Sequence, residues 1–401
     1  MWRTRIPGAH SIQGKRLLND ITALSPFDLT LGGYRMGIIV SKFGGSSTAN
    51  AENLKCIDRL IRAAPSRRCT VLSAPGIDGR HPEKVTAMLE RCWELRKAPA
   101  ALDAAVSAVA DRFREICGDL GIPDMSALAR RQIHGALAVS LPHTLSRGEY
   151  LCALAFSRYA ALPMADAADL IAFNADGTLD ERHTRLNLEG LRHRVGPVIV
   201  PGFYGADPDG HIRTLPRNGS DITGALVAAG MDADLYENWS DVPGLMTADP
   251  SLVPNARLIP HVGYRQMRAL SRAGAQVLHP ACLDPVAMAG IPTRLRNTMC
   301  PDSFGTLIDE RCEAIVPCVT GRPHAYLPDG RPAARITVFG LPPERVLDAA
   351  AALAPIGTIA NRDQTIVYCD REMYEKAVLL LHRELIEKQN GDTVSPPTQA
   401  L

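Results

Sequence analysis

The sequence predicts an α/β protein with a mostly parallel sheet between helical layers, followed by a smaller ferredoxin-like unit. Two observations predict the larger part: short apolar segments alternate with amphipathic segments from residue 37 onward, and several of the apolar segments end in glycine- or proline-rich turns. A third observation predicts the smaller part. Residues 335–388 have the pattern of a strand, a helix, one or two strands and a second helix, an order typical of ferredoxin-like units.

The predicted elements follow the chain in a regular order. Apolar stretches predict strands, and apolar residues repeated at helical spacing predict helices. In the larger part the strands are expected at residues 37–41, 69–74, 198–200, 235–242 and 293–296, and the helices at 51–64, within 82–158, within 215–230, and at 264–273 and 280–289.

Composition sets limits on the class of protein. The chain has 401 residues, 46% of them hydrophobic and 22% charged, which is typical of a globular protein of two or three domains. Its net charge of +1 argues against a surface dedicated to nucleic acid. No apolar run approaches the roughly 20 residues of a membrane helix, and no secretory signal begins the chain. We therefore expect a cytoplasmic protein.

The ten cysteines indicate neither a disulfide framework nor a structural metal. They form no C-x-x-C pair and do not accompany histidines at zinc spacing, so free thiols in a reducing compartment are expected. No metal-ligating set of side chains is predicted.

Composition shifts predict four segments. Residues 1–35 are expected to be a poorly ordered extension, because their periodicity is weak. Residues 36–310 carry the α/β alternation, and a boundary is placed near 310–334, where prolines and glycines crowd together. Residues 311–390 are predicted as the ferredoxin-like unit and 391–401 as a tail.

A candidate phosphate-binding turn follows the first predicted strand. It contains Lys42, Gly44, Gly45, Ser46 and Ser47. Paired glycines let the backbone approach a ligand closely, and N–H groups at the start of a helix attract anions. Lysine adds a point charge suited to a phosphoryl group. A tight structural turn would also need the glycines, but the lysine and the two hydroxyls favour phosphate binding.

Two further polar segments lie at element ends. Ser220 and Asp221 begin a helix, where capping alone could explain them, whereas Arg217 just before them is suited to gripping a carboxylate. Ser240 and Asp241 end a strand, the place where ligands bind in open α/β sheets. The chain lacks the P-loop, dinucleotide-binding, zinc-protease and nucleophile-elbow patterns.

Taken together, six blocks resemble aspartate kinases in order and spacing, from about Met36 to residue 310. The blocks are residues 41–47, 146–149, 218–221, 240–244, 247–250 and 274–280. The resemblance implies the amino acid kinase fold and the phosphorylation of the side-chain carboxylate of L-aspartate to 4-phospho-L-aspartate by ATP with Mg²⁺, on the route to lysine, threonine and methionine. It also implies that the C-terminal unit is a regulatory ACT-like domain and that the chain forms homodimers through it.

The resemblance assigns roles to individual residues. On the amino acid side it implies a catalytic Asp221, a Glu149 that meets the substrate ammonium, an Arg217 that meets its α-carboxylate, and further substrate contacts at Ser47, Ser73 and Ser220. On the nucleotide side it implies a catalytic Lys42 that bridges the transferred phosphoryl group and the attacking carboxylate. The other nucleotide-side residues that it implies are Gly44, Gly45, Ser46, Ser240, Asp241, Met246 and Gln276.

This chain departs from the family pattern mainly on the nucleotide side. Ser251 and Gln276 replace basic residues, and Met246 replaces a frequent tyrosine. Only one complete ACT-like unit fits after residue 310, whereas the family usually has two. Two alternatives to an aspartate kinase therefore stay open: a diverged kinase for a related amino acid in a specialised pathway, and a catalytically weak regulatory subunit that binds an amino acid.

Overall fold

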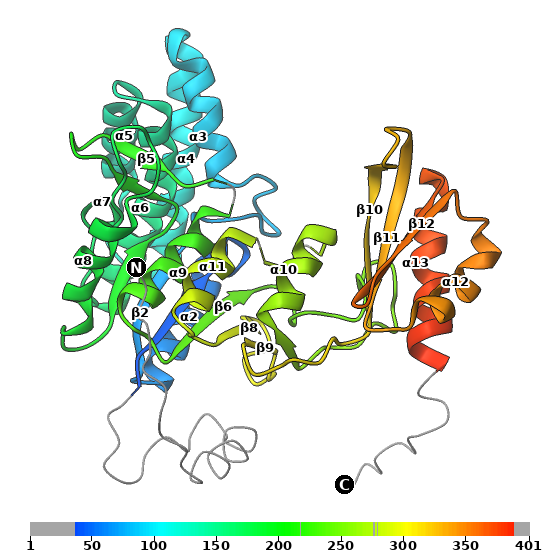
Figure 1. The fold of residues 1–401 in the computed structure, drawn as a ribbon. Coiled ribbons are helices and arrows are strands. Elements are labelled where there is room, and N and C mark those ends of the chain that lie inside the picture. The colour runs from blue at the N-terminus through cyan, green and yellow to red at the C-terminus, as the bar shows by residue number, and fades with distance from the viewer. Residues whose placement is uncertain (1–36, 217, 276, 279, 389–401) are drawn as a thin grey trace, which may run out of the picture.

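The computed structural model describes residues 37–216, 218–275, 277–278 and 280–388. The predicted extension at 1–35, the tail at 391–401, and the side chains of Arg217 and Gln276 lie outside these residues. A larger α/β part carries the blue to yellow elements, and a smaller sheet with its helices follows in orange and red (Figure 1).

The larger part is built on a seven-stranded sheet. The strand order is β3-β2-β1-β6-β8-β9-β7, and only the β8–β9 pair is antiparallel. The bounds are β1 (Ile39–Phe43), β2 (Arg67–Leu72), β3 (Val198–Pro201), β6 (Leu235–Ser240), β7 (His261–Gly263), β8 (Thr293–Asn297) and β9 (Thr306–Asp309). The predicted mostly parallel α/β sheet is confirmed.

Alternate residues of the strands face two different helical layers. Val40 and Tyr236 contribute to a core with one layer, whereas Phe43 and Trp239 contribute to a core with the other. The first layer contains α7 (Ala167–Leu170), α8 (Glu181–Arg192), α9 (Gly219–Gly230), α10 (Tyr264–Ala273) and α11 (Pro280–Met288). The second contains α2 (Ala51–Ala63), α3 (Val85–Glu94), α4 (Pro99–Leu120), α5 (Ser126–Leu137) and α6 (Leu141–Ala160).

Several helices begin where a side chain accepts from a free backbone N–H group. Asn50 accepts from Asn53 at the start of α2, and Ser140 accepts from His143 at the start of α6. Two short 3₁₀ turns, η1 (Ser46–Thr48) and η2 (Leu95–Lys97), and a hairpin of β4 (Tyr204–Ala206) and β5 (Ile212–Thr214) complete this part. The sequence analysis predicted no element for α8, which precedes the predicted strand at 198–200, and none for the hairpin, which follows that strand.

The C-terminal part is a four-stranded antiparallel sheet covered by helices. Its strand order is β10-β11-β13-β12. The bounds are β10 (Cys318–Tyr326), β11 (Pro332–Phe339), α12 (Pro343–Ala350), η3 (Ala351–Leu353), β12 (Gly357–Ala360), β13 (Gln364–Cys369), η4 (Arg371–Met373), α13 (Tyr374–His382) and the π-helical turn η5 (Arg383–Glu387). The arrangement fits the predicted ferredoxin-like, ACT-type unit, with β10 as an additional edge strand.

The two parts share core residues. Ala248 and Val253, from the loop after β6, are buried within the C-terminal core, and Cys318 and Phe339 are buried within the core of the larger part. Side-chain packing therefore crosses the predicted domain boundary near residue 310 in both directions. The position of that boundary stays a prediction. Within the described residues, no helix combines the length and the apolar character needed to cross a membrane.

Candidate functional site

The strand ends bring the predicted polar segments together. Strands β3, β2, β1 and β6 are neighbours and run parallel, so their carboxyl ends meet at one edge of the sheet. In the register, Phe43 lies beside both Leu72 and Trp239. The turn at Gly44, the loop at Ser73 and the strand end at Ser240 therefore share this edge.

The Gly44–Gly45 turn is closely packed against the loop after β2. The Gly44 N–H donates to the Trp239 carbonyl at 3.0 Å, so this N–H already closes the turn onto β6. The Gly76 N–H donates to the Gly45 carbonyl at 2.9 Å. A Cβ atom at residue 76 would lie 2.6 Å from the carbonyl carbon and oxygen of Gly45, so only glycine fits there. Thr48 Oγ1 also lies 3.2 Å from the Ala74 carbonyl oxygen.

Lys42 and Asp221 form an ion pair at this edge. Lys42 Nζ lies 2.5 Å from Asp221 Oδ1, and both side chains are largely buried. Asp221 stands in the first turn of α9, and Asn238 Nδ2 donates to the same carboxylate oxygen at 2.8 Å. The Tyr236 hydroxyl donates to the Asp221 carbonyl at 3.1 Å. The structure thus joins the two predicted catalytic residues directly.

Sequence reasoning missed Asn238 and Tyr236. Both lie on β6 at even-numbered positions, as Ser240 does, and these positions face the α9 side of the sheet. The available signal was their spacing of two and four residues from Ser240, which places all three side chains on the same face of the strand. The partner of Asn238 could not be predicted, because it depends on where α9 packs against the sheet.

Glu149 provides a buried carboxyl group from α6. The side chain is 4% exposed, and its Oε2 has no hydrogen-bond partner among the described residues. Burial raises the pKa of Glu149 to about 8, and the Ala74 N–H and the positive charge of Lys42 offset only part of that rise. A buried carboxyl oxygen without a partner is costly, so it is suited to a cationic ligand group.

The predicted serines occupy different positions around the edge. Ser73 follows β2 and donates its N–H to the Phe43 carbonyl at 3.2 Å, and Ser220 is buried at the start of α9. Ser47 Oγ lies 2.7 Å from Thr298 Oγ1, and both side chains are buried. The Ser47 hydroxyl is thus occupied by a residue that sequence reasoning missed.

The residues predicted for the nucleotide lie at the end of β6 and beyond it. Ser240 Oγ accepts from the Val242 N–H at 3.3 Å, and the Asp241 carbonyl accepts from Asn297 Nδ2 at 3.1 Å, which leaves the exposed Asp241 carboxylate outside these contacts. Met246 is half-buried and pairs with Leu258 in an isolated bridge. These contacts hold the strand end and the following loop in place.

A buried ionic cluster supports the turn from the opposite face of the sheet. Glu237 accepts hydrogen bonds from Arg67 Nε at 2.8 Å, Arg296 Nη1 at 3.2 Å and Ser41 Oγ at 2.8 Å. Burial by itself would raise the pKa of Glu237, but the two guanidinium groups hold it at about 2. Both guanidinium groups also stack over Trp239, whose ring packs on Phe43. The charges here are paired, so this cluster is structural.

Comparison with known proteins places this geometry in context. The family model "Amino acid kinase family" matches residues 37–297. Aspartokinase 3 of Bacillus subtilis is 35% identical over 290 residues, which cover 67% of this chain and 63% of that protein. The chain thus spans less than two thirds of that relative's length.

Solved structures show the same fold. The aspartate kinase of Clostridium acetobutylicum superposes with a TM-score of 0.76 at 24% identity, covering 87% of this chain and 99% of that one. Aspartokinase III of E. coli, solved in complex with aspartate and ADP, superposes with a TM-score of 0.72 at 21% identity, with the same coverage of 87% and 99%.

Proposed function

The chain belongs to the amino acid kinase family, and from this premise we propose that it transfers the γ-phosphoryl group of ATP to the side-chain carboxylate of L-aspartate. The product would be 4-phospho-L-aspartate. Support comes from the similarity to the Bacillus aspartokinase and from the fold shared with a kinase solved with aspartate and ADP.

One observation of this chain carries the proposal. The buried Glu149 has a carboxyl oxygen without a hydrogen-bond partner in the part of the chain that the structure describes, and the Ala74 N–H that bonds to Glu149 belongs to the same loop that packs on the Gly44–Gly45 turn. An α-ammonium group would supply the missing partner and would favour the ionised carboxylate. The site is therefore suited to an amino acid held next to a phosphate-binding turn.

The transfer itself requires positioning and charge neutralisation more than acid–base chemistry. The aspartate carboxylate is already ionised at neutral pH, so one of its oxygens can attack the γ-phosphorus directly while the bond to the leaving ADP oxygen breaks. Lys42 would stabilise the charge on the transferred group. Asp221, which itself accepts a hydrogen bond from Asn238, would hold the ammonium group of Lys42 in place. Arg217 is proposed for the α-carboxylate on the resemblance alone.

The residues at this edge fit a magnesium ion that arrives with the nucleotide. Asp221 is the carboxylate next to Lys42, and it is already engaged by Lys42 and Asn238. Mg²⁺ commonly binds through substrate phosphates and water with one or two carboxylates, so the exposed carboxylate of Asp241, rather than Asp221, would be its protein partner here. When bound, the ion would neutralise phosphate charge.

Trapping of the product tests the proposal. The full chain is incubated with ATP, Mg²⁺ and hydroxylamine, and with aspartate, glutamate or other amino acids in separate reactions. We expect a hydroxamate with aspartate only. A hydroxamate with another amino acid instead would support the diverged kinase, and none with any amino acid would support a regulatory subunit.

We also propose that the chain forms a homodimer through its C-terminal sheet, as the resemblance to ACT-bearing kinases implies. Light scattering coupled to gel filtration tests this, and a monomer at micromolar concentration would contradict it.

A further inference from the structure

We propose that Arg112, on helix α4, is a positioning residue that fixes the distance between two loops of the candidate site. The first loop follows β1 (residues 44–50), and the second follows β2 (residues 73–84). This inference rests on the proposed function, because it assigns these loops to the nucleotide and the amino acid. Arg112 lies on an element to which neither the sequence motifs nor the resemblance assigned any role.

The contacts of Arg112 connect two segments that are distant in sequence. Its Nη2 donates to the Ala49 carbonyl at 2.6 Å and to the Gly76 carbonyl at 3.1 Å. Ala49 follows directly on the turn η1 that contains Ser46 and Ser47, and Gly76 lies in the loop whose Ala74 N–H reaches Glu149. A single planar group thus binds the carbonyls of both loops.

Burial of the charged Arg112 guanidinium group carries a desolvation penalty that its contacts offset only in part. The Arg112 side chain is 2% exposed, and its nearest carboxylate, Asp78, lies 3.5 Å from Nη1. The Nε and Nη1 atoms have no hydrogen-bond partner among the described residues. A buried guanidinium with incomplete pairing destabilises the fold relative to an apolar side chain of similar size. Stability alone therefore does not explain an arginine at this position.

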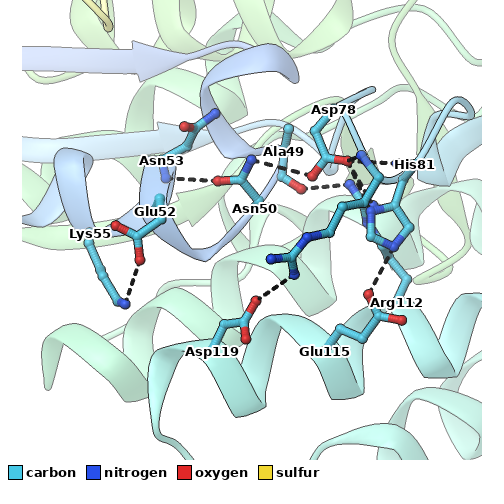
Figure 2. Close-up of polar contacts among 11 residues, drawn as sticks. Ala49, Asn50, Glu52, Asn53, Lys55, Asp78, His81, Arg112, Glu115 and Asp119 are labelled. Carbon is cyan, nitrogen blue, oxygen red and sulfur yellow. Dashed lines mark hydrogen bonds and ion pairs between the residues drawn. The ribbon is translucent and has the colours of Figure 1, made fainter.

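Helix α4 holds the second loop along one face. Figure 2 shows Arg112 beside Asp78, with Glu115 reaching His81 and Asp119 placed one turn further along. Glu115 Oε2 lies 2.9 Å from His81 Nε2, and Asp119 Oδ2 lies 3.4 Å from Arg80 Nη1. Positions 112, 115 and 119 share a helical face. The Glu115–His81 and Asp119–Arg80 pairs are partly or largely exposed, so they contribute little to holding the second loop. The buried Arg112 therefore makes the contact that determines the position of this loop.

The first loop is joined to the same group of residues. Asn50, which caps helix α2, donates from Nδ2 to Asp78 Oδ2 at 3.3 Å, as Figure 2 shows. Asp78 Oδ1 accepts from the N–H groups of Arg80 and His81. Asp78 therefore orders its own loop and contacts the start of α2, while Arg112 sets the spacing. Because phosphoryl transfer depends on alignment of donor and acceptor, a change in this spacing should lower kcat.

The test compares Arg112→Met, Arg112→Lys and Arg114→Met. Met keeps the length and removes the donors, Lys keeps the charge, and Arg114 is an exposed α4 residue paired with Asp111 that serves as the matched control. The measurements are kcat, KM for ATP and aspartate, melting temperature, and the rise in melting temperature caused by Mg²⁺-ADP.

For Arg112→Met we expect kcat to fall at least about 30-fold, on the scale of a misplacement of the reacting groups. The rise in melting temperature with Mg²⁺-ADP should be reduced, and KM for aspartate should change less than about threefold. Arg112→Lys should recover part of kcat, and Arg114→Met should match the unchanged chain.

A purely structural role would lower the melting temperature but leave kcat of the folded protein and the Mg²⁺-ADP response unchanged, and this result would overturn the inference. If the unchanged chain does not phosphorylate aspartate, the proposed function fails, and the Mg²⁺-ADP response alone decides. A response lost in Arg112→Met then supports the inference. A response that is equal in both, or absent from the unchanged chain, overturns it.

Discussion

At the residue scale, the candidate site depends on two buried ionisable groups, Lys42 and Glu149, whose partners differ. Lys42 is paired with Asp221, whereas Glu149 keeps one oxygen without a partner among the described residues. The Lys42 ammonium group is held in position by Asp221, so it can orient an anionic ligand. The Glu149 carboxyl group still has an oxygen that can accept a hydrogen bond from a cationic ligand. The two groups therefore predict different consequences when they are replaced.

Replacing Lys42 should lower kcat strongly and leave the fold intact. Lys42→Ala removes the cation next to the Gly44–Gly45 turn, so we expect kcat to fall by about 10²–10³-fold, as for the loss of one preorganised charge-stabilising group. Steady-state kinetics and circular dichroism measure both effects. The exposed Lys97→Ala serves as the control, and a kcat within tenfold of the unchanged chain would exclude Lys42 from the mechanism.

Replacing Glu149 should separate substrate binding from stability through pH. With a pKa of about 8 in the folded chain and about 4.5 when unfolded, Glu149 keeps its proton in the fold while the unfolded chain loses it. Its contribution to stability therefore falls as pH rises from 4.5 to 8. Glu149→Gln should gain melting temperature relative to the unchanged chain over that range, while KM for aspartate rises at least tenfold.

Melting curves at pH 5, 6, 7 and 8 and KM at pH 7.5 check this prediction. A constant difference in melting temperature across the pH range would show that Glu149 titrates normally, and an unchanged KM would remove it from the amino acid site.

At the scale of elements, the two loops after β1 and β2 act as one unit. The Gly76 N–H donates to the Gly45 carbonyl, and Arg112 donates to the Ala49 carbonyl of the first loop and the Gly76 carbonyl of the second. Neither loop contains a regular helix longer than the turn η1, so their conformation is set by these contacts rather than by helix propensity.

Adding one methyl group at residue 76 should disturb this unit. Gly76→Ala places a carbon 2.6 Å from the Gly45 backbone, so one loop must move, and we expect kcat to fall by tenfold or more, on the scale of a misaligned reacting group. Gly79→Ala, where no atom lies within 4 Å, is the matched control. Equal kcat values for the two variants would show that the loops tolerate a shift.

At the scale of the whole molecule, the C-terminal unit holds the loop that leaves the candidate site. Thr247 Oγ1 shares a hydrogen bond of 2.9 Å with His382 Nε2, and the Val319 N–H donates to the Thr247 carbonyl at 2.8 Å. Ala248 and Val253 add apolar contacts to the same unit. The loop after Asp241 is therefore a shared element of both parts.

Removing the C-terminal unit should destabilise the larger part. A chain ending at residue 310 would expose Ala248 and Val253 and would lose Cys318 and Phe339 from the core of the larger part. We expect most of it to be insoluble, whereas a chain ending at residue 388 should stay soluble. Soluble yield and thermal melting measure this. A folded 310-residue chain with a cooperative transition would contradict the shared core.

Much of the architecture and part of the site were predictable from the sequence because they depend on local pattern. Alternating apolar segments indicated the strands and helices. Lys42 beside Gly44 and Gly45, followed by two serines, indicated an anion site because the glycines allow close backbone approach and the lysine adds a positive charge. By contrast, the β4–β5 hairpin was missed because its strands have three residues each and too little periodicity.

The sequence by itself determined the α/β fold class and the residue types available for phosphoryl transfer, because both follow from periodicity and from side-chain chemistry. Only the tertiary structure decided which groups meet. The Lys42–Asp221 pair, the Asn238 bond to Asp221 and the Ser47–Thr298 bond join residues that are between 17 and 251 positions apart. It also decided that Glu149 would keep one oxygen without a partner among residues 37–216, 218–275, 277–278 and 280–388, and that Arg112 would span two loops. These contacts depend on how parallel strands align their ends and how α4 crosses them, and no local pattern records that alignment.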